Sequence, residues 1–96
     1  MKADFFTYII TRADGTISSA IGVLYNSLSQ AEREAFSEFD FSKDSVVQYR
    51  IEKIEQSAHE ITYGVYARDM FNRSVSHVKY IIHILPMEIA QDDWRE

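Results

Sequence analysis

Apolar and polar residues alternate with a period of two through most of the second half of the chain. The alternation recurs in residues 46–55, 61–68 and 75–85, where one set of alternate positions is apolar and the other is mostly polar. Because successive side chains of a strand point to opposite faces of the sheet, each segment predicts a strand with one core face. The joins at 56–60 and 71–74 have the length of hairpin loops, so we expect an antiparallel three-stranded meander.

The N-terminal part of the chain predicts two further strands. Residues 5–11 are aromatic or β-branched on both faces, which is typical of a central strand. Asp14 and Gly15 follow, and this dipeptide indicates a hairpin turn. Residues 16–28 fit either a strand or a helix. We favour the strand, because Gly22 would cost a helix about 1 kcal/mol and the hairpin signal precedes it.

A capped helix is expected over residues 29–39. Ser29 and Glu32 have the spacing of a capping box, in which each side chain accepts a hydrogen bond from the backbone amide of the other. An apolar stripe at helical spacing would pack against the sheet. Its members are Leu28, Ala31, Ala35, Phe36 and Phe39.

The end of the chain predicts a second, shorter helix. Pro86 has no amide hydrogen and is expected to end the last strand. Met87, Ala90 and Trp94 then recur at helical spacing. Together these elements predict a single α+β domain over residues 1–96. It would hold a mainly antiparallel sheet of about five strands, in the order ββαβββ, with one capped helix on one face and a short C-terminal helix.

Composition excludes several classes of protein. The 96 residues include no cysteine, which excludes a disulfide framework, a thiolate metal site and a cysteine nucleophile. A net charge of −5 argues against a general binder of polyanions, since phosphate contacts need a surplus of Lys and Arg. The N-terminal residues lack the apolar core of a signal peptide, and no apolar run reaches the length of a membrane span. We therefore expect a cytoplasmic protein.

Few residues are candidates for catalysis or metal binding. His77 and His83 share one face of the last strand but lie about 20 Å apart at ~3.3 Å per residue, too far to hold one metal ion. No serine has the setting of a known nucleophile, and the glycines are not clustered as in a phosphate loop. His59 and Glu60 are neighbours on a turn, where adjacent side chains point apart. We expect no metal, no cofactor and no enzyme; a small hydrolase using histidine and carboxylates is the weaker alternative.

Charge is distributed unevenly along the chain and defines two candidate binding surfaces. Residues 1–44 hold four basic and seven acidic side chains, residues 45–87 hold five basic and four acidic ones, and residues 88–96 hold one basic and four acidic ones. The polar face of the sheet would present Arg50, Tyr66, Arg68, His77, Lys79, Ile81 and His83. An acidic surface on the helix and the loop after it would present Glu32, Glu34, Glu38, Asp40 and Asp44.

These surfaces favour a small acidic protein-binding module. Tyr and Arg are common anchors of protein interfaces, so we expect an inhibitor, immunity-type protein or regulatory adaptor that occupies a partner protein. Its carboxylates could act by nucleic-acid mimicry. The alternative is single-stranded RNA or anion binding on the polar sheet face, with Tyr66 stacked on a base and Arg68 at a phosphate, although the net charge disfavours nucleic acid. Exposed apolar side chains or an unpaired strand edge also predict a homodimer.

Overall fold

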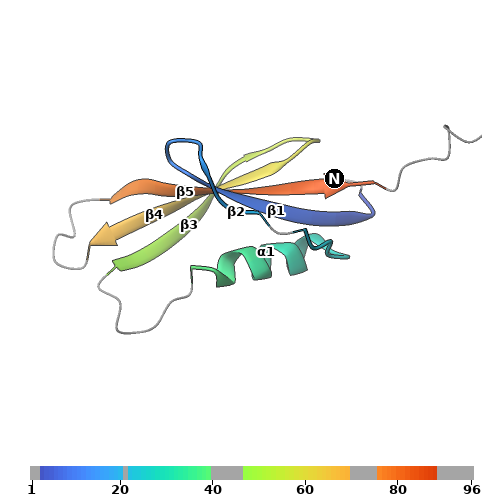
Figure 1. Cartoon of the computed structure of the whole chain (residues 1–96), viewed down its shortest axis with the longest axis horizontal. Coiled ribbons are helices and arrows are strands. Elements are labelled where there is room, and N and C mark those ends of the chain that lie inside the picture. The colour runs from blue at the N-terminus through green and yellow to red at the C-terminus, as the bar shows by residue number, and fades with distance from the viewer. Residues whose placement is uncertain (1–2, 21, 40–46, 70–75, 89–96) are drawn as a thin grey trace, which may run out of the picture.

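A five-stranded antiparallel sheet and one helix make up the part of the chain that the structure describes (Figure 1). The computed structural model describes residues 3–20, 22–39, 47–69 and 76–88. The elements, in chain order, are β1 (Phe5–Arg12), β2 (Ile17–Ala20), α1 (Leu28–Ser37), β3 (Val47–Gln56), β4 (Ile61–Asp69) and β5 (Ser76–Met87). The predicted α+β class, with an antiparallel sheet and one helix against it, is therefore confirmed. No helix within these residues has the length and apolar character needed to cross a membrane.

The strands lie in the order β2-β1-β5-β4-β3 across the sheet. β3, β4 and β5 form the expected meander, and β1 pairs along the free side of β5. β1 consequently has a neighbouring strand on each side, in agreement with its apolar residues on both faces. The hairpin between β1 and β2 turns at Gly15, whose φ of 92° lies in the region that glycine adopts without strain.

β5 continues past Pro86, the residue predicted to end it. Pro86 lies opposite Phe6 and Met87 opposite Phe5, so Met87 belongs to a strand and not to the predicted terminal helix. The pairing of β5 with β4 stops at Ile84, which leaves the last residues of β5 with a partner on one side only. A strand with a free side tolerates a missing amide hydrogen, which explains the position of Pro86. The rest of the predicted terminal helix, 88–96, lies almost entirely outside the described residues.

The N-cap of the helix lies two residues before the predicted cap, Ser29. Ser27 is the N-cap, and its Oγ accepts a hydrogen bond from the amide of Gln30 at 3.2 Å. Ser27 and Gln30 have the same spacing as Ser29 and Glu32, so the sequence contained two overlapping capping signals and the earlier one is used. The start of the ambiguous segment 16–28 is a strand, β2, as favoured.

The core lies between α1 and the sheet face that it covers. Ala31 and Ala35 are fully buried, and their small side chains allow the helix to approach the strands closely. Phe36 adds an edge-on contact with the Tyr63 ring, with centroids 5.0 Å apart. The buried side chains that the sheet contributes are Phe6, Tyr8, Ile10, Ile61, Tyr63, Val65, Ile82 and Ile84.

Two tyrosine hydroxyls attach the helix to the sheet. Tyr63 of β4 donates a hydrogen bond to Glu32 Oε2 at 2.5 Å, and Tyr8 of β1 donates one to Glu38 at the C-cap of α1. Both bonds satisfy a buried hydroxyl with a charged acceptor. Burial, together with the neighbouring carboxylate, raises the pKa of each tyrosine well above its usual value, because both oppose formation of a phenolate.

We expect these tyrosines to make the fold sensitive to alkaline pH. Their folded-state pKa is raised, so their contribution to the free energy of unfolding is complete below pH 10 and falls as the pH rises above it. Each tyrosine adds a slope of up to about 1.4 kcal/mol per pH unit. Urea unfolding of the wild type at pH 10 to 12, followed by circular dichroism, should therefore show a steeper loss than Tyr8→Phe or Tyr63→Phe. Equal slopes in all three proteins would contradict the assignment.

Candidate functional site

The face of the sheet opposite α1, termed the open face, carries the candidate site. Within the described residues α1 packs on β1 and β5 from one side only, as Figure 1 shows. The alternation in the meander predicts a mostly polar open face there, but several large apolar side chains are half-buried on this face of the sheet. Those in the paired strands β1 and β5 are Phe5, Ile9, Ile81 and Leu85.

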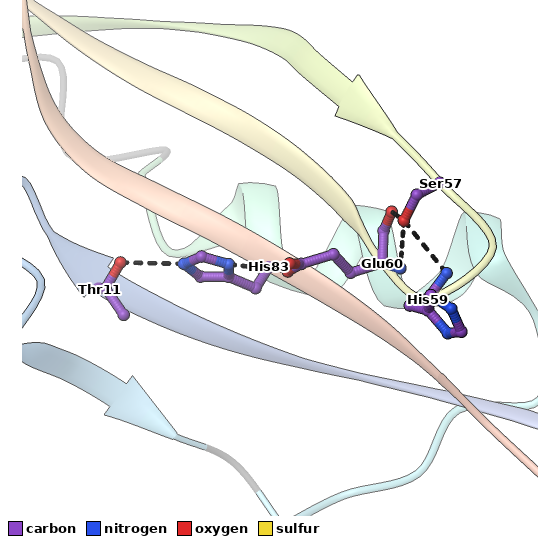
Figure 2. Close-up of polar contacts among 5 residues, drawn as sticks. All are labelled: Thr11, Ser57, His59, Glu60 and His83. Atoms are coloured by element: carbon purple, nitrogen blue, oxygen red, sulfur yellow. Dashed lines mark hydrogen bonds and ion pairs between the residues drawn. The ribbon is translucent and has the colours of Figure 1, made fainter.

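Thr11, His83 and Glu60 form a hydrogen-bonded row across the open face (Figure 2). Thr11 Oγ1 lies 3.0 Å from His83 Nε2, and His83 Nδ1 lies 3.0 Å from Glu60 Oε2. The register explains this meeting. His83 is opposite Ile9 in β1 and Thr62 in β4, so Thr11 and Glu60 are its diagonal neighbours on the same face.

The hydrogen-bond roles within this row follow from the acceptor chemistry of a carboxylate. An ionised Glu60 can only accept, so Nδ1 of His83 carries the proton and donates it. In a neutral imidazole Nε2 is then an acceptor, and the Thr11 hydroxyl donates to it. A hydroxyl, an imidazole and a carboxylate in this order form the arrangement that activates a nucleophilic oxygen in acyl transfer. The side chains of His83 and Glu60 are 27% and 42% exposed, so the row is accessible to solvent.

The hairpin between β3 and β4 positions Glu60. Ser57 Oγ accepts hydrogen bonds from the backbone amides of His59 and Glu60 at 3.1 and 3.2 Å, and the Ser57 amide donates to the Glu60 carbonyl at 2.9 Å. These bonds fix the tight turn from which the Glu60 side chain extends toward His83. The His59 ring lies at the turn and away from the Glu60 carboxylate, as expected for adjacent residues (Figure 2).

A second group of side chains lies on the open face at β3 and β4. It consists of Arg50, Ile54 and Tyr66 and is termed the Tyr66 cluster. The Arg50 guanidinium lies over the Tyr66 ring, 4.8 Å from its centroid, at the distance of a cation–π contact. Ile54 is 52% exposed and lies beside Gly64. A Cβ at Gly64 would be 2.9 Å from Ile54 Cδ1 and 2.9 Å from the Tyr66 ring, so both side chains cover the glycine backbone. Ile54 follows Arg50 and Glu52 on the same face of β3, and the register of β3 shifts by one residue at Ile54, in a β-bulge.

A β-bulge in β5 places His77 and His83 on opposite faces of the sheet, although the alternation predicts them on one face. The register of β5 against β4 shifts by one residue at Lys79. Beyond the shift His77 lies opposite Ala67, which is buried on the other side of the sheet from His83. A one-residue shift moves side chains to the opposite face, so His77 leaves the predicted set. Among the described residues no group of three histidine or acidic side chains could hold a metal ion.

The remaining members of the predicted polar face have separate positions. Ile81 lies on the open face opposite Gly64 in β4 and Thr11 in β1. Lys79 is exposed at the bulge. Arg68 lies in β4 opposite Gln48 of β3. Of the predicted set, the structure brings Arg50 and Tyr66 into contact, and it brings His83 to two residues outside the set.

The predicted acidic surface is partly used for packing. Glu32 and Glu38 are half-buried and accept hydrogen bonds from the hydroxyls of the two core tyrosines. Glu34 is exposed on α1. Asp40 and Asp44 lie outside the described residues. At least two of the five carboxylates therefore have a structural role in holding the helix.

Sequence reasoning missed Thr11 and Glu60 as partners of His83. The contacts join residues that are 72 and 23 positions apart, so no local motif marks them. The expected meander places β4 beside β5 and so was the available signal for Glu60, whereas the contact with Thr11 requires knowing that β1 lies beside β5.

Comparison with protein-family models, with curated proteins and with solved structures finds no match to this chain. The evidence on function therefore lies in the residues of the open face and their geometry.

We expect Gly64→Ala to lower the free energy of unfolding by about 1 kcal/mol, because an added methyl group would collide with Ile54 and Tyr66. Gly22→Ala is the matched control. A Cβ at Gly22 meets no atom within 4 Å, so this variant should be neutral or slightly more stable. Urea unfolding of the two variants measures the difference. A Gly64→Ala protein as stable as Gly22→Ala would contradict the packing described for the Tyr66 cluster.

Proposed function

We propose that this chain is a small acidic cytoplasmic protein-binding module that occupies a partner protein through its open face. The observation that carries the proposal is the Tyr66 cluster, where an exposed isoleucine and an arginine stacked on a tyrosine lie beside half-buried aliphatic residues. Tyr and Arg over an apolar base are typical of the residues that dominate binding energy in protein interfaces. An inhibitor, immunity-type protein or regulatory adaptor would use such a surface.

The chemistry of the open face indicates the kind of segment that it would bind. Ile54 and Ile81 offer apolar contact area, and Arg50 offers a cation held in place by the Tyr66 ring. A partner segment with an aliphatic or aromatic side chain and a neighbouring carboxylate complements both features. The acidic surface is the less favoured alternative, because Glu32 and Glu38 are engaged with core tyrosines.

Single-stranded RNA is also a less favoured occupant of the open face. Base stacking needs an accessible aromatic ring, and the Tyr66 ring already has a guanidinium over one of its faces. The net charge of −5 further weakens attraction to phosphates.

Substitution of Tyr66 tests the proposal. A protein captured from nuclease-treated native lysate by the immobilised chain is purified, and its affinity is measured by calorimetry. We expect Tyr66→Ala to weaken binding about 30-fold, as for an interface hot spot, and the matched variant Tyr66→Phe to bind within about threefold of the wild type. Glu34→Lys, on the opposite side of the molecule, should leave the affinity unchanged.

Two results would overturn this proposal. One is a captured protein whose affinity is abolished by Glu34→Lys and is unaffected by Tyr66→Ala, which would assign binding to the acidic surface. The other is capture that disappears on nuclease treatment, which would assign the open face to nucleic acid.

The Thr11–His83–Glu60 row supports a second candidate function, hydrolysis of an activated ester. The Thr11 oxygen would form a bond to the acyl carbon while the bond to the leaving alcohol breaks, and His83 Nε2 would take the threonine proton and give it to that alcohol. Water would then hydrolyse the acyl-threonine and restore the hydroxyl. Glu60 would keep the imidazole oriented through Nδ1.

Turnover of p-nitrophenyl acetate by purified variants tests this second function. Thr11→Val and His83→Gln should each lower the rate at least about tenfold, because the nucleophile and its base act as a unit. His77→Gln and His59→Gln are the matched controls and should retain the wild-type rate. If the rate falls in His83→Gln and is unchanged in Thr11→Val, the turnover comes from the His83 imidazole alone. That result would exclude the acyl-transfer mechanism.

A further inference from the structure

β3 is an edge strand with one side of its backbone facing away from the sheet. Nine of its ten residues pair with β4 on one side, and no described strand lies on the other. A long edge strand is a template for pairing with another chain. β2, at the opposite edge, has only four residues and offers a much shorter template.

The charges along β3 are self-complementary about Ile51. In an antiparallel pair of identical strands related by a two-fold axis, the residues at equal distance from the axis lie opposite each other. With the axis at Ile51, Arg50 lies opposite Glu52 of the second copy, and the symmetric contact repeats the same pair. Tyr49 and Lys53 form the next pair outward. Opposite charges directly across two strands stabilise their pairing.

We propose that a second copy of this chain adds to β3 in this register and joins the two sheets into one. Axes at Arg50, Glu52 or Lys53 would place like charges directly opposite each other, which is unfavourable. An axis at Tyr49 would place Arg50 opposite Gln48 and bring no opposite charges together. Among these registers, the one about Ile51 is therefore the one with complementary charges across the axis.

The positions of these side chains on the sheet fit the proposed pairing. Within one chain Arg50 lies opposite Tyr66, and Glu52 lies opposite Gly64. Glu52 of the second copy would therefore continue the row of Tyr66 and Arg50 across the boundary between the copies. Ile51 points to the helix side, where it packs half-buried against the core, and would meet its own copy at the axis. The ion pair between Arg50 and Glu52 within the strand, at 3.2 Å, is more than half exposed on both side chains. Exposed ion pairs contribute little, so exchanging the two of them, one in each copy, for two contacts between chains is inexpensive.

The bulge at Ile54 limits the regular pairing to the centre of β3. The register against β4 shifts there by one residue, and the bend displaces the backbone beyond it. The pairing would thus rest on residues 49–53. Glu55 lies outside that segment and provides a matched control for charge reversal on the same strand.

Mixing two charge-reversed variants tests the proposal. We expect the wild type to form a dimer at a few hundred micromolar, with twice the mass of the 11.2 kDa chain by sedimentation velocity. Arg50→Glu and Glu52→Arg should each weaken dimerisation at least about tenfold, since each places like charges opposite each other. An equimolar mixture of the two should restore the dimer, because the opposing residues then carry opposite charges. Glu55→Arg should dimerise like the wild type.

The mixture separates contacts between chains from effects within one chain. Each variant keeps two like charges on its own β3 strand after mixing, so recovery of the dimer requires pairing across the proposed axis. A mixture no more dimeric than either variant alone would exclude this register. A wild-type chain that sediments as a monomer at this concentration would overturn the proposal. Both measurements use the chain alone and so do not depend on the proposed partner of the open face.

Discussion

A ten-residue helix can cover only one face of this five-stranded sheet, and the remaining surfaces of the molecule follow from that constraint. The helix is about 15 Å long, whereas strands of eight to twelve residues extend over roughly 26–40 Å. Tyr8 and Tyr63 attach the helix to the face that it covers, since their buried hydroxyls donate to carboxylates of α1. The opposite face and the β3 edge are left without cover from the helix. The functional proposals concern these two surfaces.

The distribution of the net charge of −5 along the sequence suggested an acidic binding surface on the helix. In the folded chain, part of that charge contributes to packing. Glu32 and Glu38 hold the helix to the sheet, so they are part of the packing and not simply part of an acidic surface. On the open face, Arg50 is held over Tyr66 and His83 is held between Thr11 and Glu60. A surface of ordered polar and apolar side chains is better suited to one specific partner than to general electrostatic attraction.

Strand alternation and turn chemistry were sufficient to predict most of the fold. The meander, the Asp14-Gly15 hairpin and the helix between β2 and β3 were all expected from local pattern. The β-bulges at Ile54 and Lys79 were not, because an extra residue in one strand is recognised only from its pairing with the neighbouring strand. These bulges decide which side chains share a face, so they limited the prediction of the site more than that of the fold. The contact of His83 with Thr11 was hidden for a related reason, since it depends on β1 lying beside β5.

The central claim is that the open face is the surface that binds. Isoleucine methyl spectra of the labelled chain, recorded during titration with its captured partner, test this claim most directly. Ile9, Ile54 and Ile81 report on the open face. The reporters on the buried side are Ile10, Ile61, Ile82 and Ile84. We predict that binding shifts or broadens the three open-face signals and leaves the four buried ones near their free positions. Unchanged open-face signals in the saturated complex would contradict the account.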